Sequence, residues 1–89
     1  MKIQSVRKIT FGPHVNLFEI SYQDTDGQQR CWRIASRQDK PRCATGRFDL
    51  PDAVVIVPYH VDKNKLVIIR EFRVPLGLYQ YGFPAGLVD

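Results

Sequence analysis

The feature that most constrains the fold is a pair of strand-like segments that are apolar on both sides. "AVVIVPYH" and "KLVIIREF" each contain an uninterrupted apolar run, from Val54 to Val57 and from Leu66 to Ile69. Strands of this kind need cover on both faces of their sheet. "VDKN" between them has the composition of a turn. The two segments are therefore predicted to form the central hairpin of a larger α/β or α+β structure.

The sequence supplies no helix that could provide this cover. No stretch of the chain has the apolar spacing of an amphipathic helix. A chain of strands alone would leave sheet faces and edges exposed, and natural proteins protect such surfaces. The cover is therefore expected to come from a partner chain or from residues beyond position 89.

The N-terminal half is predicted to form an antiparallel meander. "VNLFEISYQ" alternates as a strand does, with Phe18 and Ile20 on one side. An Asp-Gly pair, a strong hairpin signal, follows it. "QRCWRIASR" is then the returning strand, with Trp32 and Ile34 on one face, and "KIQSVRKITF" is an earlier strand. Residues 38–51 have the Pro, Gly and Asp content of a loop.

Length and composition indicate one ordinary soluble domain. The chain has 89 residues, of which 44% are hydrophobic and 25% charged. It contains neither the apolar run of roughly 18 residues needed to span a membrane nor a secretory signal, so a cytoplasmic location without a membrane partner is expected. Cys31 and Cys43 form no CxxC motif and have no zinc-site spacing with His14 or His60, which indicates reduced thiols.

The net charge of +4 is unevenly distributed. Residues 28–48 contain one acid, Asp39, against six basic residues: Arg30, Arg33, Arg37, Lys40, Arg42 and Arg47. A basic stretch interleaved with Trp32 and Phe48 suits a phosphate-bearing partner, either a nucleotide or a nucleic acid. A solvated strand face and loop would have the same composition.

Two stretches carry a resemblance to a known family. "EFRVPLGLYQYGFPAGLVD", residues 71–89, resembles the segment that leads into the catalytic box of Nudix hydrolases of the ADP-sugar (ADP-ribose) pyrophosphatase type. Gly86 resembles the first glycine of that box, and Leu87 to Asp89 the next positions, so the sequence is expected to stop inside it. "GPHVNLFEISYQDTDGQQRCW", residues 12–32, resembles the hairpin that these enzymes use for dimerisation and adenine binding.

The resemblance implies roles for individual residues. Trp32 would stack on adenine, and His14 stands where some family members carry a second stacking Trp. Arg37 would contact the ADP-ribose, Arg73 would lie near the diphosphate, Leu87 would contact the substrate, and the Ala85 backbone carbonyl would bind a metal ion. Simpler roles remain open: Trp32 as a core or interface aromatic, Arg73 as a surface charge, and His14 and Ala85 as turn residues.

The resemblance also implies a function for the parent enzyme. It would hydrolyse ADP-ribose or another ADP-sugar to AMP and a sugar phosphate with Mg²⁺. Residues 1–50 would form the dimerisation and adenine-binding region of a homodimer, and residues 51–89 the start of a Nudix α/β/α fold without its catalytic helix. Because the glutamates of the box are absent, no catalytic residue is assigned. The chain alone is expected to be inactive and to hold Mg²⁺ poorly.

Two non-enzymatic functions are alternatives to this prediction. A β-rich chain with a basic, Trp-bearing segment could bind single-stranded nucleic acid, as small barrels do. The doubly apolar hairpin disfavours a small self-sufficient barrel, so nucleic acid ranks below a nucleotide as the expected partner. The second alternative is a dimerisation module without catalysis.

Overall fold

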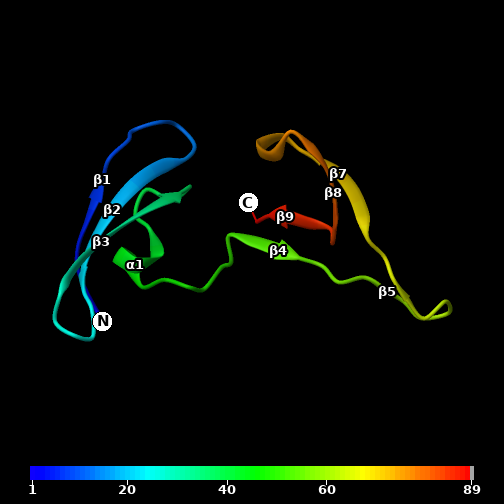
Figure 1. The fold of residues 1–89 in the computed structure, drawn as a ribbon, viewed down its shortest axis with the longest axis horizontal. Helices are drawn as coiled ribbons and strands as arrows, with labels where there is room; N and C mark the ends of the chain where they lie inside the picture. Colours follow the sequence, from blue (N-terminus) through cyan, green and yellow to red (C-terminus); the bar gives the residue numbers. More distant parts are fainter. Residues whose placement is uncertain (89) are drawn as a thin grey trace. The chain divides into compact units, whose positions relative to one another are not determined.

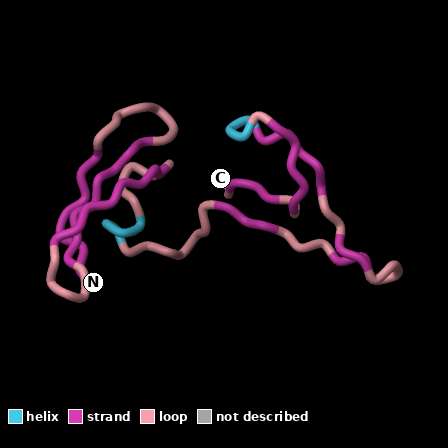
Figure 2. The backbone as a smooth tube through the Cα atoms, viewed as in Figure 1, coloured by secondary structure: helices cyan, strands magenta, loops and turns pink. Residues whose placement is uncertain are grey.

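The computed structural model describes residues 1–88 and is built mostly from strands. Strands account for 49% of these residues and helical turns for 8% (Figure 2), which confirms the prediction of a mostly β chain. The chain forms two compact units, Met1–Phe48 and Asp49–Asp89. Asp89, which was matched to the catalytic box, lies outside the described residues.

The first unit is an antiparallel meander, as predicted. Its strands are β1 (Lys2–Lys8), β2 (Asn16–Gln23) and β3 (Gln29–Ser36), in the sheet order β1-β2-β3 (Figure 1). Alternation along β2 buries Phe18 and Ile20, which are 2% and 6% exposed, and leaves Leu17 on the opposite, exposed face. These two side chains are the centre of a small core.

The turn between β2 and β3 follows from its sequence. The Gly27 N–H donates to the Asp24 carbonyl over 3.1 Å, and the Asp24 N–H donates to the Gln28 carbonyl over 2.9 Å. Gly27 has φ of 78°, in the left-handed region where a glycine has no steric penalty. The Asp24 side chain accepts hydrogen bonds from the Asp26 and Gln28 backbone N–H groups. The Asp-Gly signal thus forms a three-residue hairpin loop anchored by Asp24.

The segment after β3 folds back over β1. It contains one helical turn, α1 (Arg42–Thr45), which ends at Gly46 in the left-handed conformation. The prediction of an unstructured loop over 38–51 is therefore wrong for these four residues. A single turn has no room for the apolar periodicity that identifies longer helices, so the sequence pattern could not reveal it. Pro41, which precedes the turn, is buried in this unit.

The second unit consists of three separate two-stranded antiparallel sheets. The paired strands are β4 (Ala53–Val55) with β9 (Ala85–Leu87), β5 (Tyr59–His60) with β6 (Lys65–Leu66), and β7 (Ile69–Arg73) with β8 (Leu78–Gly82). A 3₁₀ turn, η1 (Val74–Leu76), connects β7 to β8 and ends at Gly77, whose φ is 67°. Within residues 49–88 no side chain is buried, so this unit has no core of its own.

The predicted central hairpin is only partly correct. Its turn forms at residues 61–64, but only Tyr59 and His60 pair with Lys65 and Leu66. The two apolar runs do not pair with each other, because β4 pairs with β9 and β7 pairs with β8. In "AVVIVPYH", Pro58 lies between the residues that pair with β9 and the residues that pair with β6. It has no N–H to donate to a ladder, although its carbonyl still accepts from the Val67 N–H over 2.9 Å.

Pro84 and Gly86 are residue types that favour a turn, but no turn forms at this point of the chain. The chain continues in extended form as β9, in which Gly86 pairs with Val54. Gly86 does not have a positive φ, so it is not used here as a turn residue. Pro84 fits just outside the strand, where its carbonyl accepts from the Ile56 N–H over 2.8 Å. The strand pairing therefore takes precedence over the local turn signal.

Candidate functional site

Trp32 lies on the face of the meander that also carries the core. It is paired with Ile20 across β2 and β3, and paired residues of antiparallel strands project to the same face. Its side chain is nevertheless 63% exposed, whereas Ile20 is buried. Trp32 is therefore not a core aromatic of this unit. It presents a large, planar, apolar surface to solvent.

The exposed ring of Trp32 forms part of a shallow apolar depression of about 300 Å³. We call this depression the Trp32 shelf; it is lined by Met1, Lys2, Ile3, Ile20, Tyr22 and Trp32. All six residues come from β1, β2 and β3 or from the N-terminus beside them. A depression with an aromatic wall is a suitable surface for stacking a planar ring.

Arg30 is the basic residue of β3 that lies on the same face of the sheet as Trp32. It is two positions from Trp32 and opposite Tyr22, so it lies on the same face as both. Its Nε donates to Asp24 Oδ2 over 3.0 Å, and its Nη2 donates to Gln28 Oε1 over 3.3 Å. These bonds fix the position of the guanidinium beside the shelf. Arg30 was not singled out from the sequence, although the alternation along the strand would have placed it next to Trp32.

Asp24 is itself held in place. Its carboxylate accepts from the Gln28 backbone N–H and from Arg30, and these bonds hold the pKa of Asp24 below its usual value of 3.8. The hydrogen bond from the Gln28 backbone is the larger cause. Asp24 therefore stays ionised at neutral pH and anchors Arg30 from the hairpin loop.

The opposite face of the meander carries a separate charged cluster. Glu19 lies between Arg7 and Arg33 in the sheet register, and each arginine comes within 3.1 Å of its carboxylate. The hydrogen bonds from Arg7 and then Arg33 lower the pKa of Glu19 from its usual 4.5. The basic stretch seen in the sequence is thus divided between two faces, so it does not form a single basic surface.

His14 and Arg37 lie at one end of the meander. Asn16 pairs with Ser36, so His14, which precedes β2, and Arg37, which follows β3, are at the same end. Trp32 is four residues from Ser36 along β3, roughly 13 Å at the usual rise of a strand. Within one chain the register does not bring His14 opposite Trp32. The substrate-binding roles of these three residues stay predictions.

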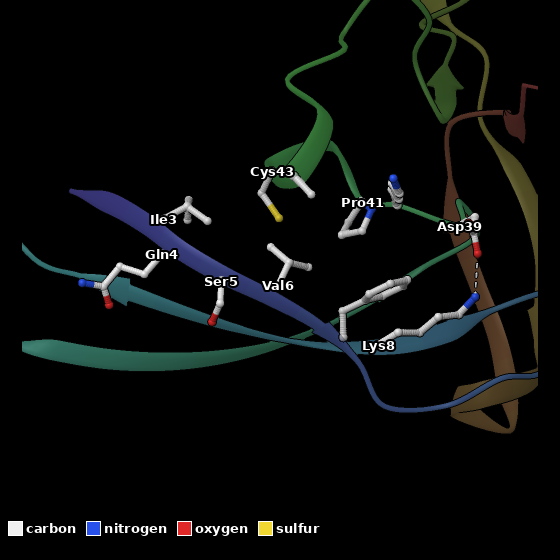
Figure 3. Close-up of a pocket in the computed structure, with 11 residues that line it drawn as sticks. Ile3, Gln4, Ser5, Val6, Lys8, Asp39, Pro41 and Cys43 are labelled. Atoms are coloured by element: carbon white, nitrogen blue, oxygen red, sulfur yellow. Dashed lines mark hydrogen bonds and ion pairs between the residues drawn. The ribbon is translucent and has the colours of Figure 1, made fainter.

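A larger cavity, of about 640 Å³, lies between β1 and the segment that carries α1. Figure 3 shows Cys43 and Pro41 on one side of it and Ile3 and Val6 on the other. At one end, Lys8 Nζ donates to Asp39 Oδ1 over 2.8 Å, which lowers the pKa of Asp39. None of the site residues predicted from the sequence lines this cavity. The two charged residues of its ion pair, Lys8 and Asp39, both belong to the lining and pair with each other.

The remaining site residues belong to the second unit. Arg73 is the last residue of β7, and its Nη1 lies 3.3 Å from Glu71 Oε1, with both side chains about half exposed. Ala85 and Leu87 are in β9, where they pair with Val55 and Ala53. Ala85 is therefore a strand residue and not a turn residue. Binding by these three residues stays a prediction.

The residues of this structure do not fit a magnesium site. Within residues 1–88 there is no group of three or more His, Cys, Asp or Glu side chains that could hold a metal ion. Mg²⁺ takes six oxygen ligands and usually at least one or two carboxylates, which the Ala85 carbonyl cannot replace. We therefore derive no chemical step through a metal ion for this chain.

Comparison with known proteins gives a distant relationship. The chain is similar to the ADP-sugar pyrophosphatase of Mus musculus, with 26% identity over 90 residues. The aligned region covers 98% of this chain but only 38% of that protein, so the chain spans well under half of its relative's length. No protein-family model matches the chain. The similarity supports a distant relationship to a hydrolase.

None of the helical turns within residues 1–88 is long and apolar enough to cross a bilayer.

Proposed function

We propose that this chain supplies the nucleotide-binding part of an ADP-sugar pyrophosphatase of the Nudix type. The parent enzyme would hydrolyse the diphosphate of ADP-ribose or a related ADP-sugar to AMP and a sugar phosphate, using Mg²⁺. The observation that carries the proposal is the exposed Trp32, on its apolar shelf, in a chain similar over 98% of its length to an ADP-sugar pyrophosphatase.

The proposed role of Trp32 follows from its surroundings. The shelf is apolar, so it would bind a nucleobase by stacking, which contributes roughly 1–3 kcal/mol per base. Arg37 would contact the ADP-ribose and Arg73 would lie near its diphosphate, since a guanidinium can donate two parallel hydrogen bonds to a phosphate. After the costs of association, such contacts support a dissociation constant of about 1 mM or weaker for this chain alone.

Binding of ADP-ribose by calorimetry tests this role. Wild-type chain is expected to bind with a dissociation constant of about 1 mM, and Trp32→Ala to weaken binding by roughly fivefold or more. Phe48→Ala is the matched control, because Phe48 is an exposed aromatic of the same unit that does not line the shelf. Equal affinity of wild type and Trp32→Ala would contradict the proposal.

Catalysis is the second part of the proposal, and it needs a separate assay. Incubation of these 89 residues with ADP-ribose and Mg²⁺ is expected to release no AMP, because the described residues hold no carboxylate cluster for the metal. AMP release by the purified chain would contradict this expectation. It would show that catalytic groups other than the box glutamates act here.

The proposed partner is a second copy of the chain. β3 is an edge strand of the meander, since the sheet order is β1-β2-β3, and an edge strand can pair with another strand. Two β3 strands would bring two Trp32 shelves together. Sedimentation across a range of protein concentrations tests this: a concentration-dependent dimer is expected, and a strict monomer at high concentration would exclude it.

A further inference from the structure

We propose that Arg30 is a cation that binds the phosphate of a nucleotide stacked on the Trp32 shelf. The inference rests on the proposed function, because it assigns a further residue to the same site. It starts from the sheet register, in which Arg30 and Trp32 share a face and Tyr22 lies opposite Arg30. Residues two apart on a strand are separated by about 6.7 Å, which is within reach of an arginine side chain.

Arg30 has donors to spare for such a ligand. A guanidinium carries five N–H donors, and Arg30 uses one on Nε for Asp24 and one on Nη2 for Gln28, which leaves three. The bonds to Asp24 and Gln28 hold the guanidinium at the hairpin loop. Because the arginine is already positioned, less side-chain freedom is lost when it binds an anion.

The surroundings of Arg30 also favour an anion. The arginine is 55% exposed, so an incoming phosphate can reach it, while its partner Asp24 is only 16% exposed. The shelf adds Lys2 as a second cation. Among residues 1–88, no acidic side chain lines the shelf. A ligand with an apolar ring and an anionic group next to it therefore fits, which is the chemistry of a nucleoside monophosphate.

Arg33 provides a matched control on the same strand. It is an arginine of similar exposure, 68% against 55%, and it is also paired with a carboxylate, that of Glu19. Three positions from Arg30, it lies on the opposite face of the sheet. A general loss of positive charge would affect both variants equally, whereas a contact at the shelf would affect only Arg30.

The experiment uses the single tryptophan of the chain as its reporter. Quenching of Trp32 fluorescence is titrated with adenosine and with AMP, for wild type, Arg30→Gln and Arg33→Gln. Arg30→Gln is expected to weaken AMP binding roughly three- to tenfold and to leave adenosine unchanged, since a half-exposed arginine contributes a modest charge-assisted contact. Arg33→Gln is expected to leave both affinities unchanged.

Adenosine also controls for folding, because a variant that still binds it retains the shelf. Equal weakening of adenosine and AMP in Arg30→Gln would overturn the phosphate role of Arg30, as would an equal loss of AMP binding in Arg33→Gln. Either result would leave the proposed function standing. Absence of quenching by both ligands in the wild type would contradict the proposed function itself.

Discussion

At the scale of single residues, the first unit depends on very few buried side chains. Phe18, Ile20 and Pro41 are its buried apolar residues within the described chain, and Asn16 is its buried polar one. The Asn16 side-chain oxygen accepts from the Thr10 hydroxyl over 3.1 Å, and its amide nitrogen donates to the Gly12 carbonyl over 3.0 Å, which closes the β1–β2 loop. With so small a core, each of these contacts carries a large share of the stability.

Phe18→Ala is expected to abolish the cooperative unfolding of this unit. Removing a buried phenylalanine costs about 3–5 kcal/mol, and a folded unit of this size has only a few kcal/mol in total. Thermal melting followed by Trp32 fluorescence measures the effect. Leu17→Ala is the control, because Leu17 is 43% exposed and should cost under about 1 kcal/mol. A Phe18→Ala variant with an unchanged melting temperature would contradict the described core.

At the scale of elements, the β2–β3 hairpin links stability to the candidate site. Asp24 closes the turn through the backbone of residues 26 and 28 and also holds Arg30 beside the shelf. The same carboxylate therefore fixes the loop and positions Arg30, the proposed phosphate-binding residue. A substitution in the turn is therefore expected to alter the surroundings of Trp32.

The pKa of Asp24 gives the hairpin a predicted pH dependence. Since folding lowers this pKa from 3.8, the carboxylate stabilises the folded unit above about pH 3.8, and the stabilisation is lost as the pH falls through the lower folded value. Asp24→Ala should lower the melting temperature at pH 7 and flatten its decline in acid. Asp26→Ala, whose carboxylate accepts no hydrogen bond within the described chain, should do neither. Parallel acid profiles for wild type and Asp24→Ala would contradict the assignment.

The elements also show what the sequence could and could not predict. Alternation and an Asp-Gly turn predicted the meander, because its strands pair with their sequence neighbours. The pairing of β4 with β9 joins residues far apart in the chain, and no local pattern reports on it. Among the site residues, Trp32 was predicted from the resemblance. Arg30 was missed, because its importance comes from Asp24 and Tyr22 across the hairpin.

At the scale of the whole molecule, the two units differ in how their strands are protected. The first has a three-stranded sheet with a buried centre, whereas the second has two-stranded sheets and no buried side chain within residues 49–88. Apolar side chains of the second unit remain exposed, among them Val55 at 66% and Tyr81 at 69%. Isolated two-stranded sheets are marginally stable in water. The segments that are apolar on both sides were expected to need cover, and within residues 49–88 their side chains are not buried.

Hydrogen exchange is expected to separate the two units. Amides of β2 should exchange slowly, because β2 is the central strand and carries the buried Phe18 and Ile20, and those of β4 to β9 should exchange close to the rate of an unfolded chain. Mass spectrometry of peptides from each unit measures this difference. Comparable protection in both units would mean that the apolar surfaces of the second unit are covered in solution.

The pairing of β4 with β9 has a kinetic consequence. Val55 and Ala85 are 85 − 55 = 30 positions apart, and every other sheet of the second unit lies between them. Three paired positions must offset the entropy lost in closing that long loop, a cost that rises with the logarithm of its length. This ladder should consequently be the last to form during folding and the first to open, so the strand with the proposed metal-binding carbonyl joins the fold only after the inner hairpins.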